Sequence, residues 1–556
     1  MNKKSAQKQK PGFNNNGFSQ AVVPSKSGFT QTQKPIYRHH PQLDDGIFYS
    51  YSYCCTIGGM IESPISIGYT SVAVHVECST SNGLPSLTIV GLASKAVDES
   101  KERIRAAIVA SGYVFPRKRI IVNLAPADIQ KNSSSLDTAI ALGILHADKQ
   151  IALKKPIVAI GELGLDGSIH ATRGIIGLLK SYISDNTKDI YFPTQNSMQV
   201  QALGLQSAYA VPNLKSIVEH LNGNRPLIAA QPGLLSTNKI SALVEPIDFA
   251  EIIGQQAAKR ALIIAAAGGH NILLSGPPGT GKSMLAKAFI SILPDLTLEQ
   301  SLETTHIHSL AGAEIEMLLT HPPLRSPHHT SSNVAIIGGG HTLRPGEISL
   351  AHNGVLFLDE LPEFPRSIIE ALRQPLEDNV VTISRAQSST TYPSDFILMA
   401  TSNPCPCGYY GSTKACTCNA HEIARYQKKI SGPILDRIDM HFTVSTVDHE
   451  NLLKKTSLKE SPDIKVIVST ARKIQKQRTD APNARLSNKE LKRVMNINKD
   501  AESFLNSAAQ KMDISARSYM KTVKLARTIA DLEKSNEITT AHITEALQYR
   551  PKQTVL

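Results

Sequence analysis

The sequence predicts a multidomain α/β protein, on three observations. Its 556 residues correspond to three or four domains at roughly 150 residues per domain. Val72, Val74 and Val76 alternate with other residues, which predicts strands, and residues 271–292 combine an apolar run, a glycine-rich loop and a helical pattern. Apolar positions then recur at helical spacing over 486–547. We therefore expect an α+β module, an α/β domain and a helical domain, in that order.

Changes in composition along the chain predict five segments. The first is polar and rich in Asn, Gln, Ser and Lys, so we expect a disordered extension. The α+β module follows, with strands at 72–76, 87–90 and 119–124 and a helix at 100–109. Residues 223–246 contain three Pro and two Gly and show no periodicity, which predicts a linker. The α/β domain follows this linker, and the helical region comes last. The five segments are 1–60, 61–222, 223–246, 247–445 and 446–556.

A phosphate-binding loop is predicted inside the α/β domain. An apolar strand at 271–275 precedes it and a helical run at 284–292 follows it, which a chance glycine-rich turn would not require. Its backbone N–H groups are expected to surround the phosphates of ATP, with Lys282 at the β- and γ-phosphates and Ser283 as a ligand of Mg²⁺. The loop fits the pattern G-x-x-x-x-G-K-[ST] and comprises Gly276, Pro277, Pro278, Gly279, Thr280, Gly281, Lys282 and Ser283.

Two further strands end in polar residues that suit a nucleotide site. Four apolar residues at 355–358 precede Asp359, expected in the Mg²⁺ shell, and Glu360, expected to activate the attacking water. The strand at 396–402 ends at Asn403, whose amide can hold the water or the γ-phosphate without adding charge. The alternative for Asp359 and Glu360 is an ordinary strand that ends in a solvated acidic pair, which the phosphate-binding loop upstream disfavours.

Four cysteines lie close together after the third of these strands. Cys405, Cys407, Cys416 and Cys418 form two C-x-C pairs, which is a tighter spacing than the usual C-x₂₋₄-C of structural zinc sites. We expect either a structural Zn²⁺ held by the four thiolates, with His421 as a substitute ligand, or four reduced thiols.

The composition excludes a disordered or membrane-spanning chain. Hydrophobic residues make up 41% and charged residues 19%, and the longest apolar run, 261–267, is far shorter than the ~18 residues that cross a bilayer. The first residues are polar and give no secretory signal, so we expect a cytoplasmic protein with no membrane partner. Lys and Arg number 59 against 47 Asp and Glu, and the resulting net charge of +12 favours a polyanionic partner.

The order of these motifs resembles that of AAA+ ATPases with a helical lid. Four stretches, at 326–330, 345–354, 372–378 and 403–408, more closely resemble the ComM/YifB-like group of magnesium-chelatase-like AAA+ ATPases, and the resemblance covers about 65–550. It implies a homo-hexameric, ATP-driven DNA motor that migrates branched junctions during the uptake of transforming DNA. The partners so implied are single-stranded or branched DNA and further copies of the chain.

The resemblance also assigns two arginines. Residues 431–439 match the motif whose arginine enters the neighbouring subunit's site, so Arg437 is the expected arginine finger. Arg517 stands at the place of the second sensor and is expected to contact the γ-phosphate from within the helical domain. Both charges would stabilise the transferred phosphoryl group. The alternative for each is an arginine at the surface or in a salt bridge.

The α+β module resembles the Lon protease domain, a ribosomal-S5-domain-2-like fold, at 160–163 and 167–169. Lon uses a serine and a lysine, because a desolvated amine activates the hydroxyl. Ser135 falls near the serine position, but Ile176 falls where the lysine should be, between Arg173 and Lys180.

Three functions compete for the whole chain: a DNA motor, a chelatase-type motor that remodels a protein partner, and an ATP-dependent protease. The missing lysine disfavours the protease.

Overall fold

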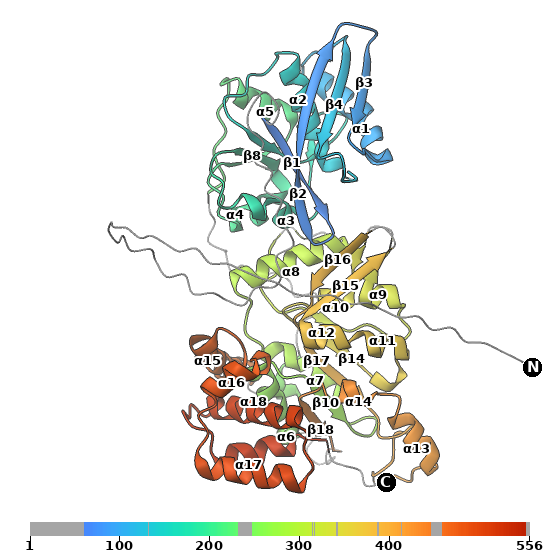
Figure 1. The fold of residues 1–556 in the computed structure, drawn as a ribbon, viewed down its shortest axis with the longest axis vertical. Coiled ribbons are helices and arrows are strands. Elements are labelled where there is room, and N and C mark those ends of the chain that lie inside the picture. The colour runs from blue at the N-terminus through green and yellow to red at the C-terminus, as the bar shows by residue number, and fades with distance from the viewer. Residues whose placement is uncertain are drawn as a thin grey trace, which may run out of the picture. The chain divides into compact units, whose positions relative to one another are not determined.

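The computed structural model describes residues 60–131, 133–231, 247–313, 315, 317–340, 343–385, 388–412, 414–445 and 459–551 (Figure 1). The expected disordered extension therefore lies, except for Met60, outside the described residues. The same holds for most of the expected linker, at 232–246, and for 446–458.

The first part of the described chain forms a seven-stranded mixed sheet. The strand order is β3-β4-β2-β1-β5-β8-β9. Strand β2 runs antiparallel to both of its neighbours, β1 and β4. The other neighbouring pairs are parallel: β3 with β4, β1 with β5, β5 with β8, and β8 with β9. The bounds are β1 Ile61–Ile67, β2 Thr70–Ser81, β3 Ser86–Val90, β4 Arg119–Ala125, β5 Ile157–Ala159, β8 Asp189–Pro193 and β9 Ala208–Val211.

Alternating side chains of this sheet pack against helices. Ile120, Val122 and Leu124 of β4 are buried together with Ile104 and Ile108 of a helix, as the period-two and helical patterns predict. The strands expected at 72–76, 87–90 and 119–124 and the helix expected at 100–109 are thus confirmed. The helices are α1 Lys95–Ala110, α2 Asp137–Ala147, α3 Ile175–Leu179, α4 Ser197–Ala202 and α5 Leu214–Leu221, and a small hairpin joins β6 Glu162–Leu163 to β7 Ile169–His170.

A second sheet has five strands, all parallel. Its order is β11-β14-β17-β10-β18, with bounds β11 Leu324–Arg325, β14 Val355–Leu358, β17 Ile397–Ser402, β10 Ile272–Ser275 and β18 Met440–Thr443. The strands expected at 271–275, 355–358 and 396–402 are confirmed as β10, β14 and β17. Strands β14 and β17 are buried along their whole length, because a parallel sheet covered on both faces needs nearly continuous apolar runs.

The two faces of this sheet contribute to two separate cores. Ile397 and Met399 of β17 pack on the side of α6 Gln256–Gly268 and α7 Lys282–Phe289. Leu398 and Ala400 pack with the apolar residues of the other face. The remaining elements of this part are α8 Leu298–Ala311, α9 Asn333–Ile337, β12 Gly338–Gly339, β13 Arg344–Pro345, α10 Glu347–Leu350, α11 Arg366–Ala371, α12 Arg373–Asp378, β15 Val380–Arg385, β16 Ser388–Pro393, α13 Ala420–Gln427 and α14 Gly432–Leu435.

The end of the described chain is helical, as the spacing of its apolar residues predicts. Helices α15 and α18 pack against α6, so their apolar residues share one core with the five-stranded sheet (Figure 1). The helices are α15 Ser461–Thr479, α16 Asn488–Val494, α17 Lys499–Lys511, α18 Ala516–Leu532 and α19 Thr540–Gln548.

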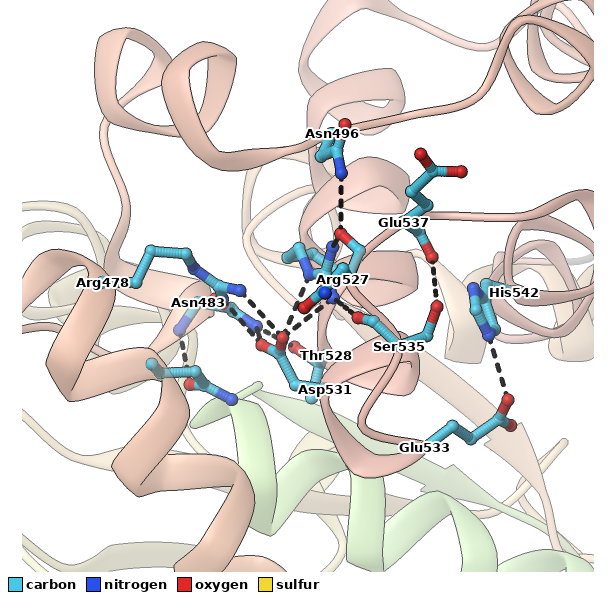
Figure 2. Close-up of polar contacts among 12 residues, drawn as sticks. Arg478, Asn483, Asn496, Arg527, Thr528, Asp531, Glu533, Ser535, Glu537 and His542 are labelled. Atoms are coloured by element: carbon cyan, nitrogen blue, oxygen red, sulfur yellow. Dashed lines mark hydrogen bonds and ion pairs between the residues drawn. The ribbon is translucent and has the colours of Figure 1, made fainter.

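A buried polar network ties α18 to α15 (Figure 2). The Asp531 carboxylate accepts hydrogen bonds from Arg478 at 2.7 and 2.9 Å, from Asn483 at 2.8 Å and from Arg527 at 3.1 Å. Arg527 also donates to the backbone carbonyl of Ser535, just after α18. Because Arg527 and Asp531 are almost fully buried, each charge depends on the other for compensation. The network fixes α18, the helix that carries Arg517.

Candidate active site

The phosphate-binding loop lies between the end of β10 and the start of α7. Gly281 has φ +81°, a left-handed conformation that glycine adopts without strain, and it immediately precedes α7. At Gly276, a Cβ atom would lie 2.5 Å from the carbonyl oxygen of Val444, so only glycine fits beside the end of β18. The helix N-terminus and the loop amides therefore meet at the carboxyl edge of the parallel sheet, where α/β proteins bind ligands.

The Lys282 amine is directed into this loop. It donates to the carbonyls of Gly276 at 2.8 Å and Pro277 at 2.9 Å, and to Asn403 Oδ1 at 3.2 Å. Burial lowers the pKa of Lys282, while the negative charges of Asp359 and Glu360 oppose that shift. The structure thus brings together Lys282 and Asn403, which lie 121 positions apart in the sequence.

The predicted acidic residues adjoin the same loop. Ser283 Oγ donates to Asp359 Oδ2 at 2.9 Å, so a hydroxyl and a carboxylate converge at one point. Oxygen donors of this kind suit Mg²⁺, and the pair fits the expected metal shell. Asn403 Nδ2 lies 3.4 Å from Glu360 Oε1. Five residues that the sequence analysis singled out, Lys282, Ser283, Asp359, Glu360 and Asn403, therefore share one edge of the sheet.

Thr401, on the central strand β17, was missed by the sequence analysis. Its hydroxyl donates to Asp359 Oδ1 at 2.6 Å and accepts from the backbone N–H of Glu360 at 2.8 Å. Thr401 is fully buried, and Glu360 has a left-handed φ of +55°, so this side chain fixes an unusual turn. Its position two residues before Asn403, at the polar end of a buried strand, is the only sequence signal for this role.

The two predicted arginines lie together at a different place. Arg437 pairs with Glu377 at 2.6 Å, and Arg517 pairs with the other oxygen of the same carboxylate at 2.8 Å. Arg517 also reaches Asp436 at 3.2 Å. The hydrogen bond from Arg437 is the main cause that lowers the pKa of Glu377. Glu377 is a second residue that the sequence analysis missed, since nothing local marks an acidic residue that bridges two arginines.

Both arginines line a cavity of about 560 Å³. The other residues that line it show where the arginine pair lies in the fold. Asn271 and Asp439, which line the cavity, directly precede β10 and β18. The cavity therefore lies at the amino edge of the five-stranded sheet, whereas the phosphate-binding loop follows the carboxyl end of β10. The expectation from the sequence had Arg517 at the γ-phosphate from within the helical domain, but in the structure Arg517 lies beside Arg437 at this amino edge. The other lining residues include Arg485, Lys521 and Lys524.

The four cysteines of the C-x-C pairs come together in space. Their sulfur atoms all lie within 4.8 Å of one another. His421, the expected substitute ligand, is exposed on α13 and is not part of this group in the described chain.

Comparisons with known proteins match most of the chain. Family models described as magnesium chelatase, subunit ChlI, match residues 248–452, and models of the ChlI subunit and of its C-terminal part match 76–196 and 459–550. Competence protein ComM of Haemophilus influenzae is 39% identical over 88% of this chain and 97% of its own length. The uncharacterized protein YifB of Escherichia coli is 38% identical over 88% of this chain and 96% of its own. The chain belongs to the ComM/YifB-like family of magnesium-chelatase-like proteins.

The chain is also similar, over a shorter stretch, to a subunit of magnesium chelatase. The magnesium-chelatase 67 kDa subunit of Chlorobaculum parvum is 30% identical over 164 residues, which is 28% of this chain and 23% of that protein.

Membership of the magnesium-chelatase-like AAA+ family implies the use of ATP and Mg²⁺. The oxygen donors of Ser283 and Asp359 are suited to Mg²⁺.

Within the part of the chain that the structure describes, the side chain of Ser135, the serine considered in the α+β module, contacts another serine and no lysine. Ser135 Oγ lies 2.7 Å from Ser133 Oγ. Lys180 pairs with Glu303 at 3.8 Å, and Ile176 is buried among apolar residues of α3.

None of the helices within the described ranges is long and apolar enough to span a bilayer.

Proposed function

We propose that this chain is an ATP-hydrolysing DNA motor, which acts as a homo-hexameric ring and migrates branched recombination intermediates during natural transformation. The geometry of the carboxyl edge, where Lys282, Ser283, Asp359, Glu360 and Asn403 converge, is the observation that supports ATP hydrolysis best. The similarity to a protein named for competence supports the DNA substrate.

In this proposal, each residue at the carboxyl edge has one task. Lys282 exchanges its carbonyl partners for the β- and γ-phosphates of ATP. Ser283 and Asp359 would hold Mg²⁺, which when bound would supply positive charge to offset the charge that develops on the phosphate oxygens. Glu360 accepts a proton from the attacking water, and Asn403, which lies against both Lys282 and Glu360, holds that water in line.

The arginine pair supports a site shared between neighbouring chains. Arg437 and Arg517 are held by Glu377 at the amino edge of the sheet, so they do not face the phosphate-binding loop of their own chain. In a ring with head-to-tail contacts, the amino edge of one chain can meet the carboxyl edge of the next. We infer that both arginines enter the neighbour's site, where a finger contributes about 10³ to 10⁵ in rate.

The net charge of +12 agrees with a nucleic-acid partner, which would be bound through its phosphates.

We further propose that residues 61–222 form a Lon-like module without peptidase activity. Residues 223–246 would link it to the ATPase core at 247–445, and residues 446–556 would form the helical lid domain. Ile176 in place of the amine is the reason to exclude peptide hydrolysis.

The test is ATPase activity with and without single-stranded and four-way-junction DNA, at about 50 and about 200 mM salt. We expect DNA to stimulate hydrolysis, and the stimulation to fade at the higher salt because phosphate contacts release counterions. Glu360→Gln is the matched control, since it nearly keeps the shape of the side chain and leaves Lys282, Ser283 and Asp359 in place for ATP binding but removes the base. DNA-stimulated turnover in Glu360→Gln, or none in the wild type, would contradict the proposal.

A second candidate is a chelatase-type motor that remodels a protein partner, because all three matching family models describe the magnesium chelatase ChlI subunit. Such a motor would hydrolyse ATP at the same site without a response to DNA. A salt-insensitive, DNA-independent ATPase in the experiment above would therefore favour this function.

A further inference from the structure

The four clustered thiols lie in the segment that joins β17 to α13. Cys405 Sγ is 3.4 Å from Cys407 Sγ and 3.7 Å from Cys416 Sγ, and Cys407 Sγ is 3.5 Å from Cys416 Sγ. With Cys418, all four sulfurs fall within 4.8 Å of one another. Two residue pairs that are about ten positions apart in the chain thus converge on one point.

These separations match the edges of a thiolate tetrahedron around a metal ion. With Zn–S bonds of about 2.3 Å, tetrahedral geometry places the sulfurs about 3.8 Å apart. A disulfide would bring two sulfurs to about 2.05 Å, far closer than any of the three distances above. We propose that Cys405, Cys407, Cys416 and Cys418 bind one structural Zn²⁺.

The surroundings of the sulfurs favour thiolates. The backbone N–H of Cys407 donates to Cys418 Sγ at 3.4 Å, and the N–H of Tyr410 donates to Cys405 Sγ at 3.3 Å. Four thiolates would repel one another without a cation, and Zn²⁺ removes that repulsion. Soft sulfur ligands select Zn²⁺ over Mg²⁺ or Ca²⁺. All four ligands come from the protein, which is typical of a structural rather than a catalytic site.

The segment needs a cross-link because it contains little else that could order it. Between Ser402 and Ala420, the described residues include no helix or strand, and only Cys405 and Gly408 are buried. A loop of this length without its own core is uncommon in a compact domain. Metal binding supplies the ordering free energy that small lobes cannot obtain from apolar burial.

The zinc-bound segment lies against the nucleotide site. Gly408 has φ +84°, and a Cβ atom there would lie 2.7 Å from Cδ of Pro278 in the phosphate-binding loop. Asn403 begins the segment and contacts Lys282. At the other end, Gln427 of α13 donates to the carbonyl of Pro404 at 3.2 Å. The metal would therefore hold Asn403 and Pro278 in place as a structural support for that site.

The proposal is tested by the metal content of the full chain, purified without chelator. We expect about one zinc per chain in the wild type and less than about a tenth in the double variant Cys405→Ser/Cys416→Ser. Cys78→Ala is the matched control, because Cys78 lies in β2, outside the cluster, and should leave the zinc content unchanged.

Because the serine variant could fail to fold, a second variant keeps the proposal falsifiable. Cys418→His preserves a zinc ligand, so it should retain about one zinc per chain, as in Cys₃His sites. Alkylation of the native wild type, mapped by mass spectrometry, should label the four cysteines only after chelator is added. Wild-type protein with less than about a tenth of a zinc and four reactive thiols, with a disulfide within the cluster, or with iron in place of zinc, would overturn the proposal. Zinc content does not depend on ATP hydrolysis, so this result is independent of the proposed function.

Discussion

Thr401→Val tests the claim that the turn after β14 is held for catalysis. Valine has nearly the shape of threonine but lacks the hydroxyl that donates to Asp359 at 2.6 Å and accepts from the N–H of Glu360 at 2.8 Å. A hydrogen bond to a charged group contributes about 1.5–3 kcal/mol. If the whole free energy of the bond to Asp359 stabilises the transition state, the loss of this bond lowers kcat/KM about 10- to 150-fold.

The assay is steady-state ATP hydrolysis over a series of Mg²⁺ concentrations, together with thermal unfolding. We expect Thr401→Val to need more Mg²⁺ for half-maximal rate, because Asp359 loses its orientation. The unpaired N–H of Glu360 should also cost about 1–3 kcal/mol of stability. Thr401→Ser is the matched control, since it keeps the hydroxyl and loses only one buried methyl, worth about 1 kcal/mol. The reasoning fails if valine leaves the rate and the Mg²⁺ dependence unchanged, or if serine impairs both as strongly as valine.

Three further predictions concern other parts of the chain. Arg437→Ala should keep ATP affinity within about threefold and lower kcat about 10³-fold or more, measured by equilibrium binding and single-turnover hydrolysis; wild-type turnover would remove the role. Burial raises the pKa of Asp439, but Lys521 and His270 outweigh it and keep the pKa below its usual range. Asp439→Asn should therefore lower the free energy of unfolding at pH 7 by about 3–5 kcal/mol, because it leaves Lys521 buried without its partner. The folded carboxyl has the lower pKa, so its contribution is present above pH ~4 and is lost as the pH falls further. Denaturant unfolding at several pH values checks this, and an equal loss at pH 7 and below pH 3 would count against it. Ser135→Ala should leave ATPase activity unchanged, and neither this variant nor the wild type should cleave peptides; a wild-type peptidase activity that Ser135→Ala abolishes would restore the protease hypothesis.

Local pattern was sufficient to predict the elements that carry the candidate nucleotide site. Strands β10, β14 and β17 are short apolar runs that end in glycine, acid or amide, and such runs have few alternatives in an α/β domain. The parallel sheet then brings their carboxyl ends together, which explains why residues about 40 and 120 positions apart meet as expected.

Tertiary placement could not be obtained from the same patterns. The position of Arg517 depends on how α18 packs against α6, and its partner Glu377 lies 140 positions away. Thr401 gave no signal beyond its position near the polar end of a buried strand, since a threonine in such a strand usually indicates β propensity alone. The cysteine spacing left zinc and free thiols both open, and the convergence of the four sulfurs, which the spacing does not show, is the observation that supports the zinc proposal.

The central claim, that ATP is hydrolysed between neighbouring chains, is tested most directly by mixing two inactive variants. Glu360→Gln lacks the base but offers its arginine to a neighbour, while Arg437→Ala retains the base and lacks the finger. The two are co-expressed with different tags and purified through both. Random assembly would pair an intact base with an intact finger at about a quarter of the sites, so the mixture should recover about a quarter of wild-type turnover. Mixed assemblies that are no more active than either variant alone would contradict the shared site.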